Sequence, residues 1–151
     1  MQKTVLILED IRSLWNVGAL FRSADVFGVS KIFLCGITGR PPRKEISKVA
    51  LGAEQWVAWE YRPAVWGVVA ELRQEHYRTV ALEKTDTSGS IHEYQPSFPL
   101  ALVLGNEVTG VSPETLRAVH EVVHIPMVGK KESLNVAVAG GIALFALLGR
   151  G

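Results

Sequence analysis

Short apolar runs alternate along the chain with segments in which apolar residues recur at helical spacing. A short apolar run bounded by polar residues is typical of a strand that is buried on both faces. The segments with this pattern are Val5–Leu8, Lys31–Cys35, Trp56–Tyr61, Val80–Glu83, Leu100–Leu104 and Val122–Ile125. Helices are expected between or after them at Asn16–Phe27, Pro63–His76, Ser112–His120 and Val136–Leu148. This alternation predicts an α/β fold, with a mostly parallel sheet of about six strands flanked by helices on both faces.

The stretch His124–Leu148 contains the most apolar of these helices. After Asn135 the helix is built only from Val, Ala, Gly, Ile, Leu and Phe. A helix that is apolar all round is normally buried in the core of a soluble protein. We therefore expect it to be buried, with Ser133 and Asn135 at the mouth of an enclosed site.

The composition fits one domain that spans residues 1–151. A chain of this length can bury a core without disulfides or structural metals. Its 48% hydrophobic and 21% charged residues are typical of an ordered globular protein. The 16 basic residues nearly balance the 15 acidic ones, so any surface that binds nucleic acid has to be local.

Other classes of site and location are disfavoured by the sequence. Cys35 is the only cysteine, which excludes a disulfide or a thiolate metal site. The histidines show no metal-ligand spacing with cysteines or carboxylates, so no metal is predicted. The apolar run near the N-terminus is too short for a signal peptide, and no run is long enough to cross a membrane. These features predict a cytoplasmic protein with no membrane partner.

The loops that follow three of the strands are the candidate ligand site, because ligands of open α/β sheets bind beyond the carboxyl ends of the strands. These loops start after Glu83, Leu104 and Ile125, and they contain Gly105, Gly110 and Gly129. Glycine lets a backbone approach a ligand closely. There is neither a G-x-G-x-x-G motif nor a P-loop, so a conventional dinucleotide or triphosphate site is not expected.

The first helix carries a second group of candidates. Gly18, Arg22 and Asp25 share one stripe of this helix, and Gly18 would leave a bare patch where a ligand or anion could lie. The structural alternatives are simpler: Asn16 would cap the helix, and Arg22 would form a surface ion pair with Asp25.

Three segments together resemble a known family: Asn16 to Asp25, Leu102 to Ser112 and Ile125 to Ala139. In order and spacing they are similar to the three motifs of the SpoU/TrmH family of SPOUT RNA ribose 2′-O-methyltransferases. The resemblance spans nearly the whole chain and shows no departure at the motif positions. We therefore expect no appended RNA-binding domain.

The resemblance implies a SPOUT α/β-knot fold with a C-terminal trefoil knot, a homodimer and S-adenosyl-L-methionine as cofactor. Pattern reasoning alone would exclude the knot, because threaded chains are rare. The cofactor would be held largely by backbone groups of Leu82, Glu83, Lys84, Leu104, Gly105, Asn106, Glu107, Ile125, Pro126, Met127, Ser133, Leu134, Asn135 and Ala137.

The same resemblance assigns the catalytic roles to Arg22, Asn16, Glu107, Ser133 and Asn135. Arg22 matches the arginine that acts at the reacting hydroxyl, in a pocket completed by the partner subunit. A guanidinium stays charged, with a pKa above about 12, so we expect electrostatic stabilisation and not general-base catalysis. Asn16 would orient Arg22 or the ribose. Glu107, Ser133 and Asn135 would hold the substrate and the arginine, and Ser133 could also cap the last helix.

An RNA substrate needs a positive surface, and the segment Gly36–Lys48 reads as an exposed basic loop. The candidate RNA-binding residues are Arg12, Arg40, Arg43, Lys44, Lys48, Lys130 and Lys131. Such phosphate contacts set affinity more than sequence choice. An ordinary solvated loop is the alternative. The substrate would be tRNA or rRNA, with tRNA slightly favoured.

Three other functions compete with this hypothesis. The acidic pair Glu9–Asp10 suggests a receiver-type phosphoacceptor module, but the third strand lacks the aspartate that would be phosphorylated. A non-catalytic RNA-binding assembly factor of the same fold stays open. So does a SPOUT base methyltransferase, which the pair Asn16 and Arg22 disfavours because this motif belongs to the ribose-modifying branch.

Overall fold

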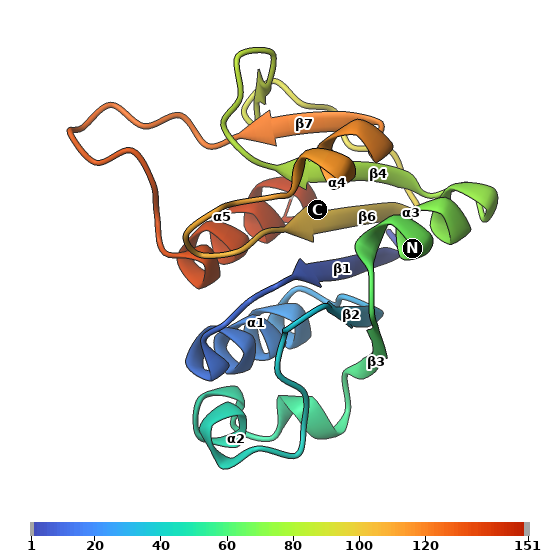
Figure 1. Cartoon of the computed structure of the whole chain (residues 1–151), viewed down its shortest axis with the longest axis vertical. Coiled ribbons are helices and arrows are strands. Elements are labelled where there is room, and N and C mark those ends of the chain that lie inside the picture. Colours follow the sequence, from blue (N-terminus) through green and yellow to red (C-terminus); the bar gives the residue numbers. More distant parts are fainter. Residues whose placement is uncertain (1, 150–151) are drawn as a thin grey trace.

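The computed structural model describes residues 2–149 and consists of a parallel sheet between two layers of helices (Figure 1). In chain order the elements are β1 (Thr4–Glu9), α1 (Leu14–Val26), β2 (Lys31–Cys35), α2 (Lys44–Ala50), the 3₁₀ helix η1 (Ala53–Gln55), β3 (Ala58–Arg62), α3 (Val65–Gln74), β4 (Arg78–Leu82), β5 (Gly89–Ser90), β6 (Leu100–Leu104), α4 (Pro113–Ala118), β7 (Glu121–His124) and α5 (Val136–Leu148).

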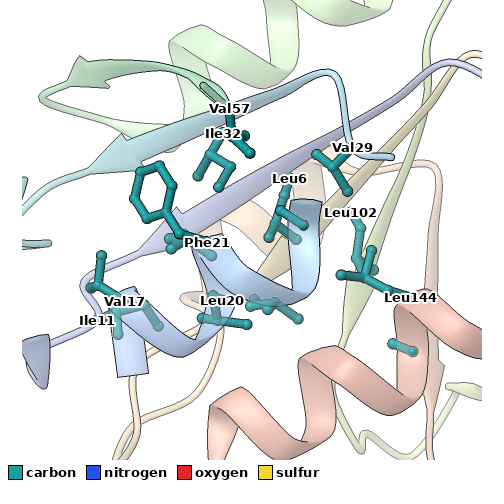
Figure 2. Close-up of a cluster of buried hydrophobic side chains, with 14 of the residues drawn as sticks. Leu6, Ile11, Val17, Leu20, Phe21, Val29, Ile32, Val57, Leu102 and Leu144 are labelled. Atoms are coloured by element: carbon teal, nitrogen blue, oxygen red, sulfur yellow. The ribbon is translucent and has the colours of Figure 1, made fainter. Parts of the chain in front are cut away.

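The sheet has the strand order β3-β2-β1-β6-β4-β7-β5, and neighbouring strands are parallel throughout. Alternate residues of β1 enter different cores. Leu6 and Leu8 pack in the core beneath α1 and α5, which Figure 2 shows with Phe21 and Leu144. Val5 and Ile7 pack in the core beneath α3 and α4. The predicted α/β architecture with helices on both faces is therefore confirmed.

The structure adds one strand, one α-helix and the 3₁₀ helix η1 to the predicted elements. The segment 84–99 was expected to be a loop, but Gly89 and Ser90 pair with β7 as a seventh, very short strand. The segment 36–48 was expected to be a loop throughout, but α2 begins at Lys44. The prolines and basic residues before α2 hide its helical signal, which is carried by buried Ile46 and Ala50.

Gly18 serves packing between helices and does not leave the bare patch that its position suggested. Helix α2 lies across it, so that a Cβ at residue 18 would fall 2.6 Å from the carbonyl oxygen of Ile46 and 3.0 Å from Cβ of Val49. The absence of a side chain therefore allows α1 and α2 to touch, and no ligand can lie there.

Gly18→Ala should destabilise the protein by about 1–2 kcal/mol, because overpacking outweighs the gain in helix propensity. Gly67→Ala is the matched control, since a Cβ on this glycine of α3 would meet nothing within 4 Å. The control should be neutral or stabilising by up to about 1 kcal/mol. Urea unfolding of both variants measures the difference, and equal stabilities would contradict the packing role of Gly18.

Helix α5 is only half buried in this chain, which corrects the expectation that it lies wholly in the core. Gly140, Ala143, Leu144 and Leu147 face the sheet and α1. On the opposite side Val138, Ile142 and Phe145 are 51%, 41% and 63% exposed. Because apolar residues occupy every side of the helix, the pattern indicated burial. It did not indicate which side is covered by this chain itself.

Candidate active site

A cleft of about 220 Å³ opens beyond the carboxyl ends of β4, β6 and β7. Three loops form it, and the longest of them, between β7 and α5, projects from the body of the molecule in Figure 1. The lining consists of Leu82, Glu83, Lys84, Leu104, Gly105, Asn106, Glu107, Val108, Thr109, Gly110, His124, Ile125, Met127, Glu132, Ser133, Leu134, Val136 and Ala139.

The cleft brings together most of the residues that were expected to hold a cofactor. Pro126, Asn135 and Ala137 lie outside its lining. The lining also contains residues that were not named as cofactor contacts: Val108, Thr109, Gly110, His124, Glu132, Val136 and Ala139. The glycine at position 110 was a usable signal. Val108, Thr109 and Glu132 lie in loops, which lack the periodicity that marks a strand or helix. His124 ends β7, and Val136 and Ala139 belong to α5, where the apolar pattern indicated burial and not a ligand.

The loop after β6 is held in a compact turn. Asn106 and Gly110 pair across it, and a Cβ on Gly105 would clash with the backbone of Gly110 and Val111. Gly110 has a φ of 73°, which favours glycine. The Glu83 carboxylate accepts a hydrogen bond of 2.8 Å from the Val111 amide and so ties this loop to the end of β4.

A hydrogen-bonded chain links the three sequence segments that carried the family resemblance. Nδ2 of Asn16 donates to Oε2 of Glu107 at 3.1 Å, and Nδ2 of Asn135 donates to Oδ1 of Asn16 at 3.2 Å. Asn16 is therefore not the cap of α1, which is Ser13. Asn135, not Ser133, caps α5 by accepting from the backbone of its first turn. Ser133 lines the cleft and is exposed.

Glu107 also fixes the start of α1. Its two carboxylate oxygens accept hydrogen bonds of 2.9 Å from the amides of Arg12 and Ser13. Partial burial opposes ionisation, but these amides and Asn16 outweigh it, so the pKa of Glu107 is lowered from its ordinary value. The carboxylate is ionised at neutral pH and joins the β6 loop to α1.

Glu107→Gln should lower the melting temperature at pH 7, and the deficit should shrink on acidification. A carboxylate whose pKa is lower in the folded than in the unfolded protein stabilises the fold when the pH is above its unfolded-state pKa of about 4.3. This stabilisation is lost as the pH falls through the folded-state pKa. Thermal unfolding between about pH 3 and pH 7 measures this. Glu75→Gln, at an exposed residue after α3, is the control. A deficit that does not change with pH would contradict the ionised role.

Arg22 lies outside the cleft, on the outer face of α1. Trp15 and Val26 share this face, because they stand seven residues before and four residues after it. The ion pair with Asp25 is not formed among the described residues 2–149. Instead Oδ1 of Asp25 accepts a hydrogen bond of 2.8 Å from Nε1 of Trp56.

The residues expected to bind RNA are all exposed but lie on separate parts of the surface. Arg40 precedes α2 and stacks over the ring of Tyr61 at 4.2 Å. Arg43, Lys44 and Lys48 belong to α2 and its cap. Arg12 begins the approach to α1, and Lys130 and Lys131 stand on the projecting loop before α5.

The acidic pair after β1 has a structural use. The Glu9 carboxylate accepts hydrogen bonds from Ser112 and Thr115 at the start of α4. Asp10 accepts one from the Ile37 amide.

Within residues 2–149, no three His, Cys, Asp or Glu side chains are grouped as metal ligands would be, and no helix is long and apolar enough to span a membrane.

The family model described as the SpoU rRNA Methylase family matches residues 3–145. The chain belongs to this family. Its membership confirms the resemblance drawn from the three segments and excludes the receiver-type module. The trefoil knot that the resemblance implied stays a prediction.

Relatives of this SpoU-family chain are named for action on different RNAs. The tRNA (guanosine(18)-2′-O)-methyltransferase of Escherichia coli (strain K12) is 28% identical over 138 residues, which are 91% of this chain and 59% of the relative. The 23S rRNA (guanosine-2′-O-)-methyltransferase of Vibrio parahaemolyticus is 32% identical, over 93% of this chain and 57% of the relative. This chain therefore spans little more than half the length of these relatives.

A similar solved structure contains a cofactor. The AdoMet-bound rRNA methyltransferase of Sinorhizobium meliloti superposes with a TM-score of 0.86 at 28% identity. The superposition covers 97% of this SpoU-family chain and 56% of the other.

Proposed function

We propose that this protein transfers the methyl group of S-adenosyl-L-methionine to a ribose 2′-hydroxyl of RNA. The hydrogen-bonded chain from Glu107 through Asn16 to Asn135 is the observation that carries the proposal. It joins the cleft to α1, which bears Arg22. The names of the two relatives support this chemistry and leave both tRNA and rRNA as substrate classes, with tRNA slightly favoured. Such a substrate would be met in the cytoplasm.

The lining of the cleft suits S-adenosyl-L-methionine in polarity and charge. Apolar side chains of Leu82, Leu104 and Ile125 can cover an adenine, while the glycine-containing β6 loop offers backbone donors and acceptors. The lining has three carboxylates, Glu83, Glu107 and Glu132, against the single ammonium of Lys84. This excess of negative charge suits a cationic sulfonium. The cofactor would supply an activated methyl group.

Arg22 would assist the hydroxyl without acting as a base. Because a charged guanidinium has no acceptor lone pair, it cannot take the proton. It can stabilise negative charge that develops on the 2′-oxygen and hold the neighbouring phosphate in a bidentate contact. Asn16 and Glu107 fix the first turn of the helix that carries Arg22. Ser133, which lines the cleft, would help to hold the substrate, and Asn135 would do so through its hydrogen bond to Asn16.

The second feature of the proposal is a homodimer formed through α1 and α5. Val138, Ile142 and Phe145 of α5 lie beside the exposed face of α1, since Phe145 packs edge-on against Phe27 at the end of α1. An exposed apolar surface on two adjacent helices is typical of an interface. Arg22 lies on that face of α1 and not in the cleft of its own chain. In a symmetric dimer it would act at the cleft of the partner.

The positive residues around the site would bind RNA phosphates. Arg43, Lys44 and Lys48 belong to α2 and its cap, and α2 packs beside α1. Arg40 precedes α2, and Lys130 and Lys131 stand on the projecting loop. Such contacts weaken as salt concentration rises, because phosphate binding releases counterions.

The proposal is tested with purified protein, labelled S-adenosyl-L-methionine, and total tRNA and rRNA from a strain that lacks the gene. We expect label on a ribose 2′-oxygen at one nucleotide, located by nuclease mapping. Label on a base would favour the base methyltransferase. RNA and cofactor binding without label in either RNA fraction would favour the assembly factor.

A further inference from the structure

Arg22 and Asp25 stand three residues apart on α1, a spacing at which opposite charges usually pair. Here Asp25 is engaged elsewhere, through the 2.8 Å hydrogen bond that it accepts from the indole of Trp56. We propose that Trp56 is a positioning residue that holds the Asp25 carboxylate away from Arg22 and so keeps the guanidinium free for RNA. This inference rests on the proposed function, because it assigns the freed guanidinium to the reaction.

Asp25 lies where its negative charge does not stabilise the helix. Asp25 is the last residue but one of α1, and the carbonyl end of a helix favours cations over anions. A carboxylate at this place needs donors from outside the helix backbone. Arg22 on the same helix could supply such a donor, but the hydrogen bond that Asp25 accepts comes from Trp56, in the segment after η1.

The Trp56 indole is held in place by the turn before it. Gly52 has a φ of 93°, and a Cβ at that residue would lie 3.1 Å from two ring carbons of Trp56. The six-membered ring of the indole therefore lies close to the glycine while its N–H reaches Asp25. The side chain is 62% exposed, so burial alone does not explain its orientation.

The consequence for Arg22 is that its guanidinium has no carboxylate partner among residues 2–149. If the indole donor is lost, the nearest opposite charge for Asp25 on its own helix is Arg22. An ion pair of this kind is weak, but it has to be broken whenever Arg22 engages a phosphate or the reacting oxygen. Loss of the indole donor should therefore lower kcat, and this effect should require a negative charge at residue 25.

The test compares Trp56→Phe, Asp25→Asn and the double variant in the methyl-transfer assay. Trp56→Phe removes the N–H and keeps an aromatic ring, and we expect kcat to fall about two- to fivefold, as the strength of an exposed ion pair converts to rate. In the Asp25→Asn background the same Trp56→Phe change should cost nothing, because no carboxylate remains to capture Arg22. Trp66→Phe is the matched control, at a similarly exposed tryptophan on α3.

Three outcomes would overturn the inference. If the double variant is as slow as Trp56→Phe, the indole acts by itself. A raised KM for RNA that Asp25→Asn does not relieve would place Trp56 in contact with RNA. An unchanged kcat in Trp56→Phe would also overturn it. If wild-type protein methylates no RNA, the proposed function fails. The indole hydrogen bond is then checked alone, by the shift of the Trp56 Nε1–H resonance in Asp25→Asn.

Discussion

Arg22→Ala is expected to reduce methyl transfer about a hundredfold or more while leaving S-adenosyl-L-methionine binding unchanged. The size follows from the loss of a positioned charge that stabilises a developing oxyanion. Cofactor binding should survive because Arg22 does not line the cleft of its own chain, and at the partner's cleft it would contact the RNA and not the cofactor. Single-turnover rates with saturating RNA and isothermal titration with the cofactor measure the two quantities separately.

Arg22→Lys is the matched variant for this prediction. It keeps the positive charge but loses the planar pair of donors, so its rate should fall between wild type and Arg22→Ala. Equal loss of transfer and of cofactor binding in Arg22→Ala would show a structural role instead. Full activity of that variant would remove Arg22 from the mechanism and leave the cofactor cleft without a catalytic cation from α1.

Ile142→Asp is expected to convert the protein from a dimer to a monomer of 16.5 kDa and to abolish methyl transfer. Ile142 lies between Val138 and Phe145 on the exposed face of α5, where an unpaired carboxylate would be buried on association. Transfer should stop because Arg22 would no longer reach a partner's cleft. Light scattering after gel filtration gives the mass, and circular dichroism shows that the fold persists.

Trp66→Asp controls for the effect of adding a charge to an exposed apolar site. Trp66 is 67% exposed on α3, on the other side of the sheet, so this variant should remain dimeric and active. A monomeric but fully active Ile142→Asp protein would show that each chain carries a complete site. A dimeric Ile142→Asp protein would place the interface elsewhere.

Helix α2 shows how a local signal can be hidden. Its apolar residues are few and follow prolines and basic residues, so Gly36–Lys48 read as a loop. The buried residues Ile46 and Ala50 do recur at helical spacing. The sequence did not predict α2 because a short helix gains most of its stability from packing, here against Gly18, and not from its own sequence.

In the candidate site, the sequence could identify some residues but not the contacts between them. Asn16, Glu107 and Asn135 could be selected from the sequence, because the three segments match a family in order and spacing. Their hydrogen bonds to one another could not be, since residues 91 and 119 positions apart meet only after the sheet has formed. Asp25 is a similar case, because its partner Trp56 is 31 residues away.

The sequence by itself determined the alternation of strands and helices, the parallel sheet and the family, because burial periods and motif spacing are local properties of the chain. Only the tertiary structure decided which half of α5 this chain covers, what Gly18 touches and which group binds Asp25. The physical reason is that a pattern of apolar and polar residues records that a side chain is covered or paired. It does not record which other part of the molecule covers or pairs with it.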